Sequence, residues 1–319
     1  MKIVALAGGV GGARLADGLA RCLQTDELTV VVNTGDDFEH YGLQICPDID
    51  TVCYTLSGLA NSQTGWGLAG ESFQALEAAE RLGGPDWFRV GDRDLGTHLE
   101  RTRRVRAGEP LSQITADFCA AWGISARVLP MSDQPVATIV HTVDEGDLAF
   151  QEYFVHQRCL PVVTGFQFQG IEQAQPAPGL LEAIAAADSV IICPSNPWVS
   201  IGPILALQGV LEALHQSRVV AVSPIIGGKA VKGPAAKMYT ELGFTPSALA
   251  VAAQYRSFLS GFVLDLIDRD AVNEMAQWGI ISLTTDILMP EPADRKRLAR
   301  DVLDFCETLP GRNDRRNTA

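Results

Sequence analysis

The first thirty residues read as a strand, a glycine loop and a helix, and this unit constrains the fold more than any other part of the chain. Residues 3–7 are apolar, Gly8-Gly9-Val10-Gly11-Gly12 follows, and leucines then recur every four residues from Leu15. A second apolar run, residues 28–32, completes a strand–helix–strand unit, the building block of parallel α/β sheets. Glycines here let the backbone approach a ligand, and free N–H groups at a helix start can bind an anion.

The same alternation returns in the second half of the chain. It predicts strands over 189–193, 218–222 and 280–283, and helices over 203–215, 234–242 and 293–306. Between them we expect helices over 72–81 and 111–122 and strands over 136–142 and 149–155. The fold class is therefore α/β, a doubly wound, mostly parallel Rossmann-like sheet with an inserted helical and β cap. The core takes residues 1–60 and 170–310, the cap residues 61–169, and residues 311–319 form a flexible tail.

Composition excludes several classes of protein. The net charge of −13 makes a general nucleic-acid binder improbable, because a phosphate backbone would be repelled. Seven cysteines without C-x-x-C spacing disfavour a disulfide framework and a thiolate zinc site, and they fit a reducing cytoplasm. No apolar run reaches the roughly 18 residues of a membrane helix. We expect a cytoplasmic protein with small-molecule substrates.

Three common enzyme motifs are incomplete. A dinucleotide fingerprint through Gly9 and Gly11 would need a third glycine where Arg14 stands, and Asn33 replaces the acidic residue after the second strand. The turn Gly227-Gly228-Lys229 resembles a P-loop but lacks the following Ser or Thr. No G-x-S-x-G elbow appears. Nicotinamide binding, an ordinary P-loop and a serine hydrolase are thus disfavoured, while a phosphate-facing glycine turn or a simple tight turn both stay open.

Four aspartates, Asp36, Asp37, Asp48 and Asp50, lie within fifteen residues after the second strand. This is the edge where open α/β sheets bind ligands. One or two of these carboxylates could hold a hard cation such as Mg²⁺, or one could accept a proton from an attacking hydroxyl. The alternative is ordinary helix capping by Asp48 or Asp50.

Arg89 and the turn Ser195-Asn196 supply the other candidates. Arg89, beside two aromatic residues, is a candidate for binding phosphate or carboxylate, whereas residues 101–106 fit a solvated helix face. The turn Ser195-Asn196 follows an apolar strand and offers hydroxyl and amide groups. The five histidines show no metal-binding spacing, and His98 is at most polar lining.

Ordered together, these motifs resemble the 2-phospho-L-lactate transferase family (CofD/FbiA) of coenzyme F-420 biosynthesis. The resemblance runs from residue 3 to about 290, and only the ordered set of motifs is specific. The matching stretches are GGVGGARL (8–15), VNTGDD (32–37), CPDIDT (46–51), GWG (65–67), GDRD (91–94), THL (97–99), LPMSD (129–133), QEYFV (151–155), PSNP (194–197) and SPIIGG (223–228).

The resemblance implies transfer of a phospholactyl-type group (2-phospholactate, phosphoenolpyruvate or phosphoglycerate) from a guanosine diphosphate conjugate to the deazaflavin Fo, with release of GMP. It also implies Mg²⁺ and a homodimer. Asp50 and Arg89 fall on positions that contact Fo. The guanosine diphosphate would lie against Gly9, Gly11, Thr51 and the two turns, Ser195-Asn196 and Gly227-Gly228.

This chemistry depends mainly on positioning and charge neutralisation. We therefore expect Asp50 to hold Mg²⁺ or to orient the attacking hydroxyl, with Asp37 as a second acidic partner. The rival hypothesis is a non-catalytic regulator of a related family that binds a nucleotide sugar without turnover. Detection of GMP after incubation with Fo and the donor would separate the two.

Overall fold

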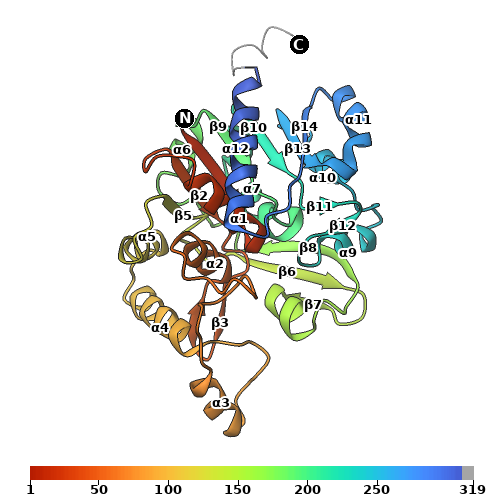
Figure 1. Ribbon diagram of the computed structural model, residues 1–319. Coiled ribbons are helices and arrows are strands. Elements are labelled where there is room, and N and C mark those ends of the chain that lie inside the picture. The colour runs from red at the N-terminus through yellow and green to blue at the C-terminus, as the bar shows by residue number, and fades with distance from the viewer. Residues whose placement is uncertain (311–319) are drawn as a thin grey trace.

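The computed structural model describes residues 1–310, which form a sheet covered by helices on both faces (Figure 1). Over this range the central sheet has seven strands, all parallel, in the order β14-β13-β10-β9-β1-β2-β5. The strands are β1 (Ile3–Ala7), β2 (Leu28–Val32), β5 (Arg127–Pro130), β9 (Ser189–Ile192), β10 (Val219–Val222), β13 (Gly261–Asp265) and β14 (Ile281–Thr285).

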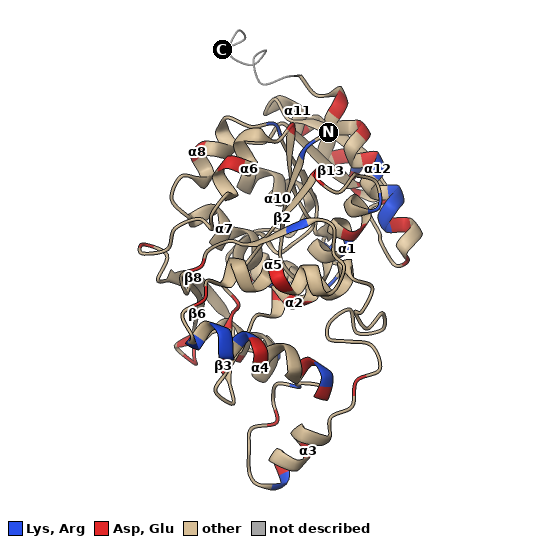
Figure 2. Cartoon of the chain, turned by 90° about the vertical axis from the view of Figure 1, so that its left-hand side faces the viewer, with Lys and Arg blue, Asp and Glu red and all other residues tan. Residues whose placement is uncertain are grey.

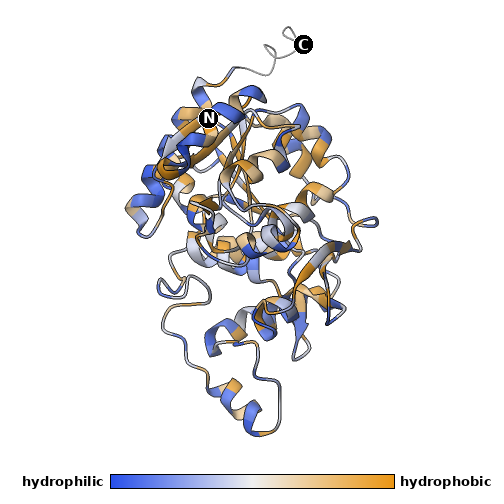
Figure 3. Cartoon of the chain, turned by 90° about the vertical axis from the view of Figure 1, so that its right-hand side faces the viewer, coloured by the Kyte–Doolittle hydropathy of each residue, from blue (hydrophilic) through white to orange (hydrophobic). Residues whose placement is uncertain are grey.

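The inner strands are mainly apolar because both of their faces are covered. In β1, Val4 and Leu6 pack into one core while Ile3 and Ala5 pack into the other. Figure 3 shows this apolar centre, with the hydrophilic residues mainly on the outer helices. Such two-sided burial is what a doubly wound sheet requires.

The helices divide between the two faces. One core contains residues of α1 (Gly9–Ala20), α2 (Pro47–Leu56), α5 (Leu111–Ala121) and α12 (Pro292–Thr308). The other contains residues of α6 (Leu180–Ala186), α7 (Gly202–Ala206), α8 (Val210–His215), α9 (Ala235–Glu241), α10 (Ala248–Tyr255) and α11 (Val272–Gln277). The α/β, doubly wound prediction is confirmed.

The strand order reverses between β1 and β9. From β1 the chain proceeds through β2 to β5 on one side, whereas β9, β10, β13 and β14 extend the sheet on the other. Ligands of open α/β sheets bind at such a switch point, beyond the carboxyl ends of the strands. The glycine loop follows β1 and the turn at Ser195 follows β9, so both lie at this point.

Smaller elements surround the carboxyl edge of the sheet. Strands β6 (Ala137–Thr142), β7 (Asp147–Ala149) and β8 (Val163–Gln169) form an antiparallel sheet, and two hairpins join β3 (Phe38–His40) to β4 (Leu43–Ile45) and β11 (Ile225–Ile226) to β12 (Lys229–Ala230). Helices α3 (Gln74–Arg81) and α4 (Asp92–Arg106) project below the core in Figure 1. Short π turns cover Glu152–His156 and Pro197–Ile201, and a 3₁₀ turn covers Leu266–Ala271.

Most predicted elements appear within two residues of their expected limits, but three expectations need correction. The helix expected over 203–215 is divided into α7 and α8, because Gly209 adopts a left-handed conformation with φ of +83°. The strand expected over 149–155 ends at Ala149. Phe150 and Tyr153 are both buried, and Tyr153 lies in the π turn Glu152–His156. The range expected for the cap, residues 61–169, includes β5, which belongs to the central sheet, so this range is wrong for residues 127–130. The tail prediction for residues 311–319 lies outside the described residues.

Charged side chains lie mainly on the outer surfaces, and Figure 2 shows both signs alternating along α4 and α12. Within residues 1–310, no helix combines the length and apolar character needed to cross a bilayer.

Candidate active site

The glycine loop is shaped by the turn that follows β9. A Cβ on Gly11 would lie 2.3 Å from the Pro194 carbonyl oxygen, and one on Gly12 would lie 2.6 Å from Ser195 Oγ. Ser195 Oγ also donates to the Gly8 carbonyl oxygen at 2.8 Å and accepts from the Gly8 N–H at 3.1 Å. These glycines are therefore required by packing of the loop against residues 194–195, and the Ser195 hydroxyl is already engaged there.

Asp48 ties the loop to α2. Gly9 has a φ of +62° and donates its N–H to Asp48 Oδ1 at 2.7 Å, while Asn33 Nδ2 donates to Asp48 Oδ2 at 3.0 Å. Asp48 lies inside α2, whose N-cap position is Cys46, so the helix-capping interpretation of Asp48 is wrong. Burial raises the pKa of Asp48 to about 6, against the effect of its two donors.

Asp36 and Asp37 adjoin Asp48. Burial and the charge of Asp48 raise the pKa of Asp36, and burial raises the pKa of Asp37. Within the described chain, Oδ1 of each aspartate is buried without a hydrogen-bond partner, as is Oγ1 of Thr34. Buried carboxylates with free oxygens and no cationic partner suit a hard divalent cation, whose preferred ligands are oxygens.

Asp50, two residues after Asp48 in α2, has the opposite surroundings. Arg101 of α4 is 1% exposed and pairs with both Asp50 oxygens, at 3.0 Å from Nη1 to Oδ2 and through Nη2 to Oδ1. The expectation of a solvated face for residues 101–106 is therefore wrong for Arg101. Its guanidinium neutralises Asp50 within the protein.

Three further groups complete this buried network. His98 Nδ1 lies 3.3 Å from Arg101 Nη1, and His98 Nε2 lies 3.4 Å from Asp94 Oδ2. Tyr54 donates its hydroxyl to Asp94 Oδ1 at 2.5 Å. Ligand atoms of Asp50, Asp94 and His98 lie within 4.8 Å of one another, which the histidine spacing did not reveal. In the sequence, Asp94, His98 and Arg101 are four and then three residues apart, which places them on one helix face. This spacing could have predicted the network.

Arg89 lies elsewhere. It is exposed, and its guanidinium lies 4.2 Å from the centroid of the Phe73 ring. The cation that contacts Asp50 is Arg101, so the structure does not bring Arg89 into the Asp50 network.

The remaining predicted ligand residues have partners inside the protein. Gly227 and Gly228 have positive φ angles, +54° and +77°, and form the tight turn of the β11–β12 hairpin. The Gly227 N–H donates to the Asp268 carboxylate at 3.0 Å. Asn196 Oδ1 accepts from the Trp198 N–H at 3.0 Å. The Thr51 carbonyl accepts from Thr55 Oγ1 at 2.7 Å. The ligand contacts of these residues stay predictions.

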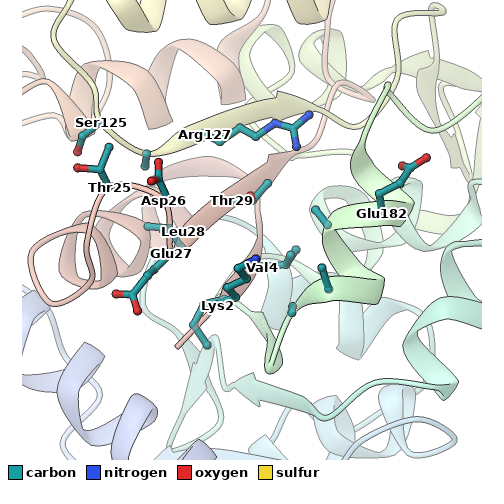
Figure 4. A pocket seen from close by; sticks show the side chains of 15 residues that line it. Lys2, Val4, Thr25, Asp26, Glu27, Leu28, Thr29, Ser125, Arg127 and Glu182 are labelled. Atoms are coloured by element: carbon teal, nitrogen blue, oxygen red, sulfur yellow. The ribbon is translucent and has the colours of Figure 1, made fainter.

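A cavity of about 400 Å³ lies at the other end of the sheet (Figure 4). Lys2, Thr29 and Arg127 line it near the amino ends of β1, β2 and β5. Because open α/β sheets bind their ligands at the carboxyl ends of strands, we place the candidate active site at the glycine loop and not in this cavity.

Comparisons with known proteins show the family to which the chain belongs. Residues 3–288 match the family model described as 2-phospho-L-lactate transferase CofD. A phosphoenolpyruvate transferase of Streptomyces griseus is 44% identical over 316 residues, covering 97% of this chain and 99% of the relative. A 2-phospho-L-lactate transferase of Methanosarcina acetivorans is 39% identical over 309 residues, covering 96% and 100%.

A solved structure of a UPF0052 protein from Bacillus halodurans superposes with a TM-score of 0.59 at 15% identity, covering 95% of this chain and 98% of that one. At this identity the likeness concerns the fold alone.

Proposed function

The chain belongs to the 2-phospho-L-lactate transferase CofD family, and we propose that it transfers a phosphorylated three-carbon acid from a guanosine diphosphate conjugate to the deazaflavin Fo. In this reaction a hydroxyl of Fo attacks the β-phosphorus and forms a new P–O bond. The bond from that phosphorus to the bridging oxygen breaks, GMP leaves, and the hydroxyl proton is released. The observation that carries the proposal is the group of buried carboxylates beside the glycine loop at the switch point.

Among the possible three-carbon groups, we favour phosphoenolpyruvate. Five relatives named phosphoenolpyruvate transferase are 41–44% identical to the chain, whereas three named 2-phospho-L-lactate transferase are 39–40% identical. Phospholactyl and phosphoglyceryl donors are the alternatives that an assay must include.

Mg²⁺ fits the carboxylates that lack a cationic partner. Asp36 and Asp48 are better suited to hold it than Asp50, because both Asp50 oxygens already face the Arg101 guanidinium. Asp37, whose Oδ1 is buried without a partner, can contribute as well. A divalent ion bound there would neutralise charge on the diphosphate.

For Asp50 we propose the second role expected of it, which is to orient the attacking hydroxyl. Arg101 fixes the Asp50 carboxylate, and His98 lies against Arg101, so the side chain is held in one orientation. A fixed carboxylate can accept a hydrogen bond from the attacking hydroxyl and align it with the phosphorus. No covalent protein nucleophile is needed for such a transfer.

The test is a mass-resolved assay of the purified protein with Fo, Mg²⁺ and each of the three guanosine diphosphate conjugates. We expect GMP release and the phosphoenolpyruvyl product, and a loss of turnover in Asp50→Asn. Binding of the nucleotide without GMP release would favour the regulator instead, and normal turnover of Asp50→Asn would remove Asp50 from the mechanism. We also expect a homodimer, which analytical ultracentrifugation of the same preparation would measure.

A further inference from the structure

One face of α1 carries an arginine between two other cations. Val10, Arg14 and Gly18 recur every four residues and therefore share this face. At one end, a Cβ on Gly65 would lie 2.9 Å from Val10 Cγ1 and 3.1 Å from Lys232 Nζ. At the other end, a Cβ on Gly18 would lie 2.1 Å from the Arg295 carbonyl oxygen. Arg14 thus lies between the segments that carry Lys232 and Arg295.

The carboxylates of this region are already engaged. Asp17 pairs with Arg295 at 3.1 Å and with Arg21 at 2.9 Å. Glu291 accepts from the first turn of α12 in a capping box. In the part of the chain that the structure describes, neither Arg14 nor Lys232 forms an ion pair, although the protein has 38 acidic and 25 basic residues.

The electrostatics of the two cations agree with this geometry. Partial desolvation and the charge of Arg295 lower the pKa of Arg14, against the opposing charge of Glu291, and partial desolvation and the charge of Arg14 lower the pKa of Lys232. Two cations that repel each other in a partly desolvated place are stabilised when an anion binds between them.

We propose that Arg14 and Lys232 form a subsite for an anionic group of the donor, either a phosphate or the carboxylate of the three-carbon acid. The proposal rests on the proposed function for the identity of the donor. Side chains on a helix lean toward its N-terminus, so Arg14 extends toward the glycine loop. Its planar fork can bind two oxygens of one group, while the Lys232 ammonium acts as a point charge.

Lys232 also links two segments of the chain beside the proposed subsite. Its ammonium donates to the Thr64 carbonyl, so the loop that carries Gly65 is linked to the segment after β12. An anion bound by Lys232 would therefore lie where α1, the loop at residues 64–65 and the segment after β12 meet. This contact distinguishes Lys232 from Lys296, an exposed lysine of α12 that lies outside the candidate ligand-binding turns.

The experiment compares Arg14→Gln and Lys232→Met with the control Lys296→Met, which removes an exposed lysine of α12. Isothermal titration calorimetry measures the binding of GDP and of the guanosine diphosphate conjugate of phosphoenolpyruvate to the full-length proteins. We expect each subsite variant to raise the Kd about tenfold, the effect of losing one charge-assisted hydrogen bond, and the control to stay within about twofold of the wild type. A loss for both ligands identifies a phosphate as the bound group, and a loss for the conjugate alone identifies its carboxylate.

Unchanged affinity of both subsite variants for both ligands would overturn the proposal. Because Lys232 is exposed, its replacement is not expected to disturb folding, and a thermal melt checks this for Arg14→Gln. The proposed function fails separately, through absence of GMP release by the wild type with Fo and the donors. The calorimetric comparison with GDP would still decide on the subsite in that case.

Discussion

Asp48 and Asp50 are two residues apart in α2, are equally buried, and have opposite surroundings. Asp50 faces the Arg101 guanidinium, backed by His98 and Asp94. Asp48 has only neutral donors, the Gly9 N–H and the Asn33 amide, and Asp36 repels it.

The difference separates two uses of a buried carboxylate. A carboxylate whose charge is balanced inside the protein is held in position and contributes to the fold. A carboxylate left without a counter-charge keeps an unfavourable energy that only a proton or a bound cation relieves. Under the proposed function, the Asp50 network would therefore position the attacking hydroxyl and the pair Asp36–Asp48 would bind the cation.

Removal of Arg101 should have the largest effect. Arg101→Met leaves Asp50 buried without its cation, and such changes destabilise proteins by about 3–5 kcal/mol. Urea denaturation measures the free energy of unfolding. The double variant Asp50→Asn/Arg101→Met should recover part of the loss. Arg103→Met, which removes an exposed partner of Glu100 on the same helix, is the control and should leave stability unchanged. Equal losses in the two arginine variants would refute the neutralised-network interpretation.

Asp48→Asn should affect catalysis more than stability. Loss of an outer-shell partner of a metal ligand typically lowers metal affinity or activity by about 10–100-fold, so loss of the ligand itself should lower GMP release at least that much and raise the Mg²⁺ requirement. The matched variant is Asp50→Asn, for which we expect slower turnover with an unchanged Mg²⁺ requirement. A shifted Mg²⁺ dependence in Asp50→Asn and none in Asp48→Asn would reverse our assignment.

Stabilisation by Mg²⁺ should depend on pH. At pH 8 and at a concentration 100 times its Kd, Mg²⁺ should add about 2.7 kcal/mol to the free energy of unfolding. At pH 5 only about one-tenth of Asp48 is ionised, because its pKa is about 6, so the gain should fall to about 1.4 kcal/mol. Thermal melts with and without Mg²⁺ at both pH values measure this, and equal gains would contradict it.

Without Mg²⁺, the pH dependence of stability has the opposite sign, because the contribution of Asp48 to the free energy of unfolding falls as the pH rises. The pKa of Asp48 is raised in the folded state from 3.8 to about 6, so its contribution to stability is complete below pH 4 and is lost as the pH rises through 6. The metal-free protein should thus lose about 1.4 kcal/mol from this group between pH 5 and pH 8. Asp48→Asn should lack this part of the pH dependence.

Tyr54→Phe should have the smallest effect. It removes the hydrogen bond from the Tyr54 hydroxyl to Asp94, worth about 1 kcal/mol, while the Asp50–Arg101 pair remains. Urea denaturation should show this modest loss. A loss as large as that of Arg101→Met would mean that Asp94, and not Arg101, holds the network together.

The sequence was sufficient for features that depend on neighbouring residues. The unit β1–α1–β2 was predicted because an apolar run, glycines and helical leucine spacing follow one another directly. Strands β5 and β13 were missed, since each is short and owes its place to pairing with a distant strand. The carboxyl edge of the sheet, where the glycine loop, the aspartates and the Ser195 turn lie, was predicted from the rule that open α/β sheets bind ligands at this edge.

The inside of the site was harder to predict. Arg101 stands among four arginines in six residues, and nothing local distinguishes it from exposed Arg103. Its burial results from the packing of α4 against the chain that precedes α2, where Arg101 Nη1 also donates to the Gln44 carbonyl at 3.4 Å. Whether an aspartate has a counter-charge is a long-range property, so the sequence placed the four aspartates together but did not rank them.

Contacts of the first loop also limit how the protein can be recombined with its relatives. Gly8, Gly11 and Gly12 leave room only for Ser200, Pro194 and Ser195, respectively, and these segments are separated by more than 180 residues in the chain. A chimera that takes residues 1–20 from another member must therefore take residues 190–202 from the same parent. Exchange of either segment alone would create steric clashes wherever the other parent has a side chain at position 8, 11 or 12, or a larger residue at position 194, 195 or 200.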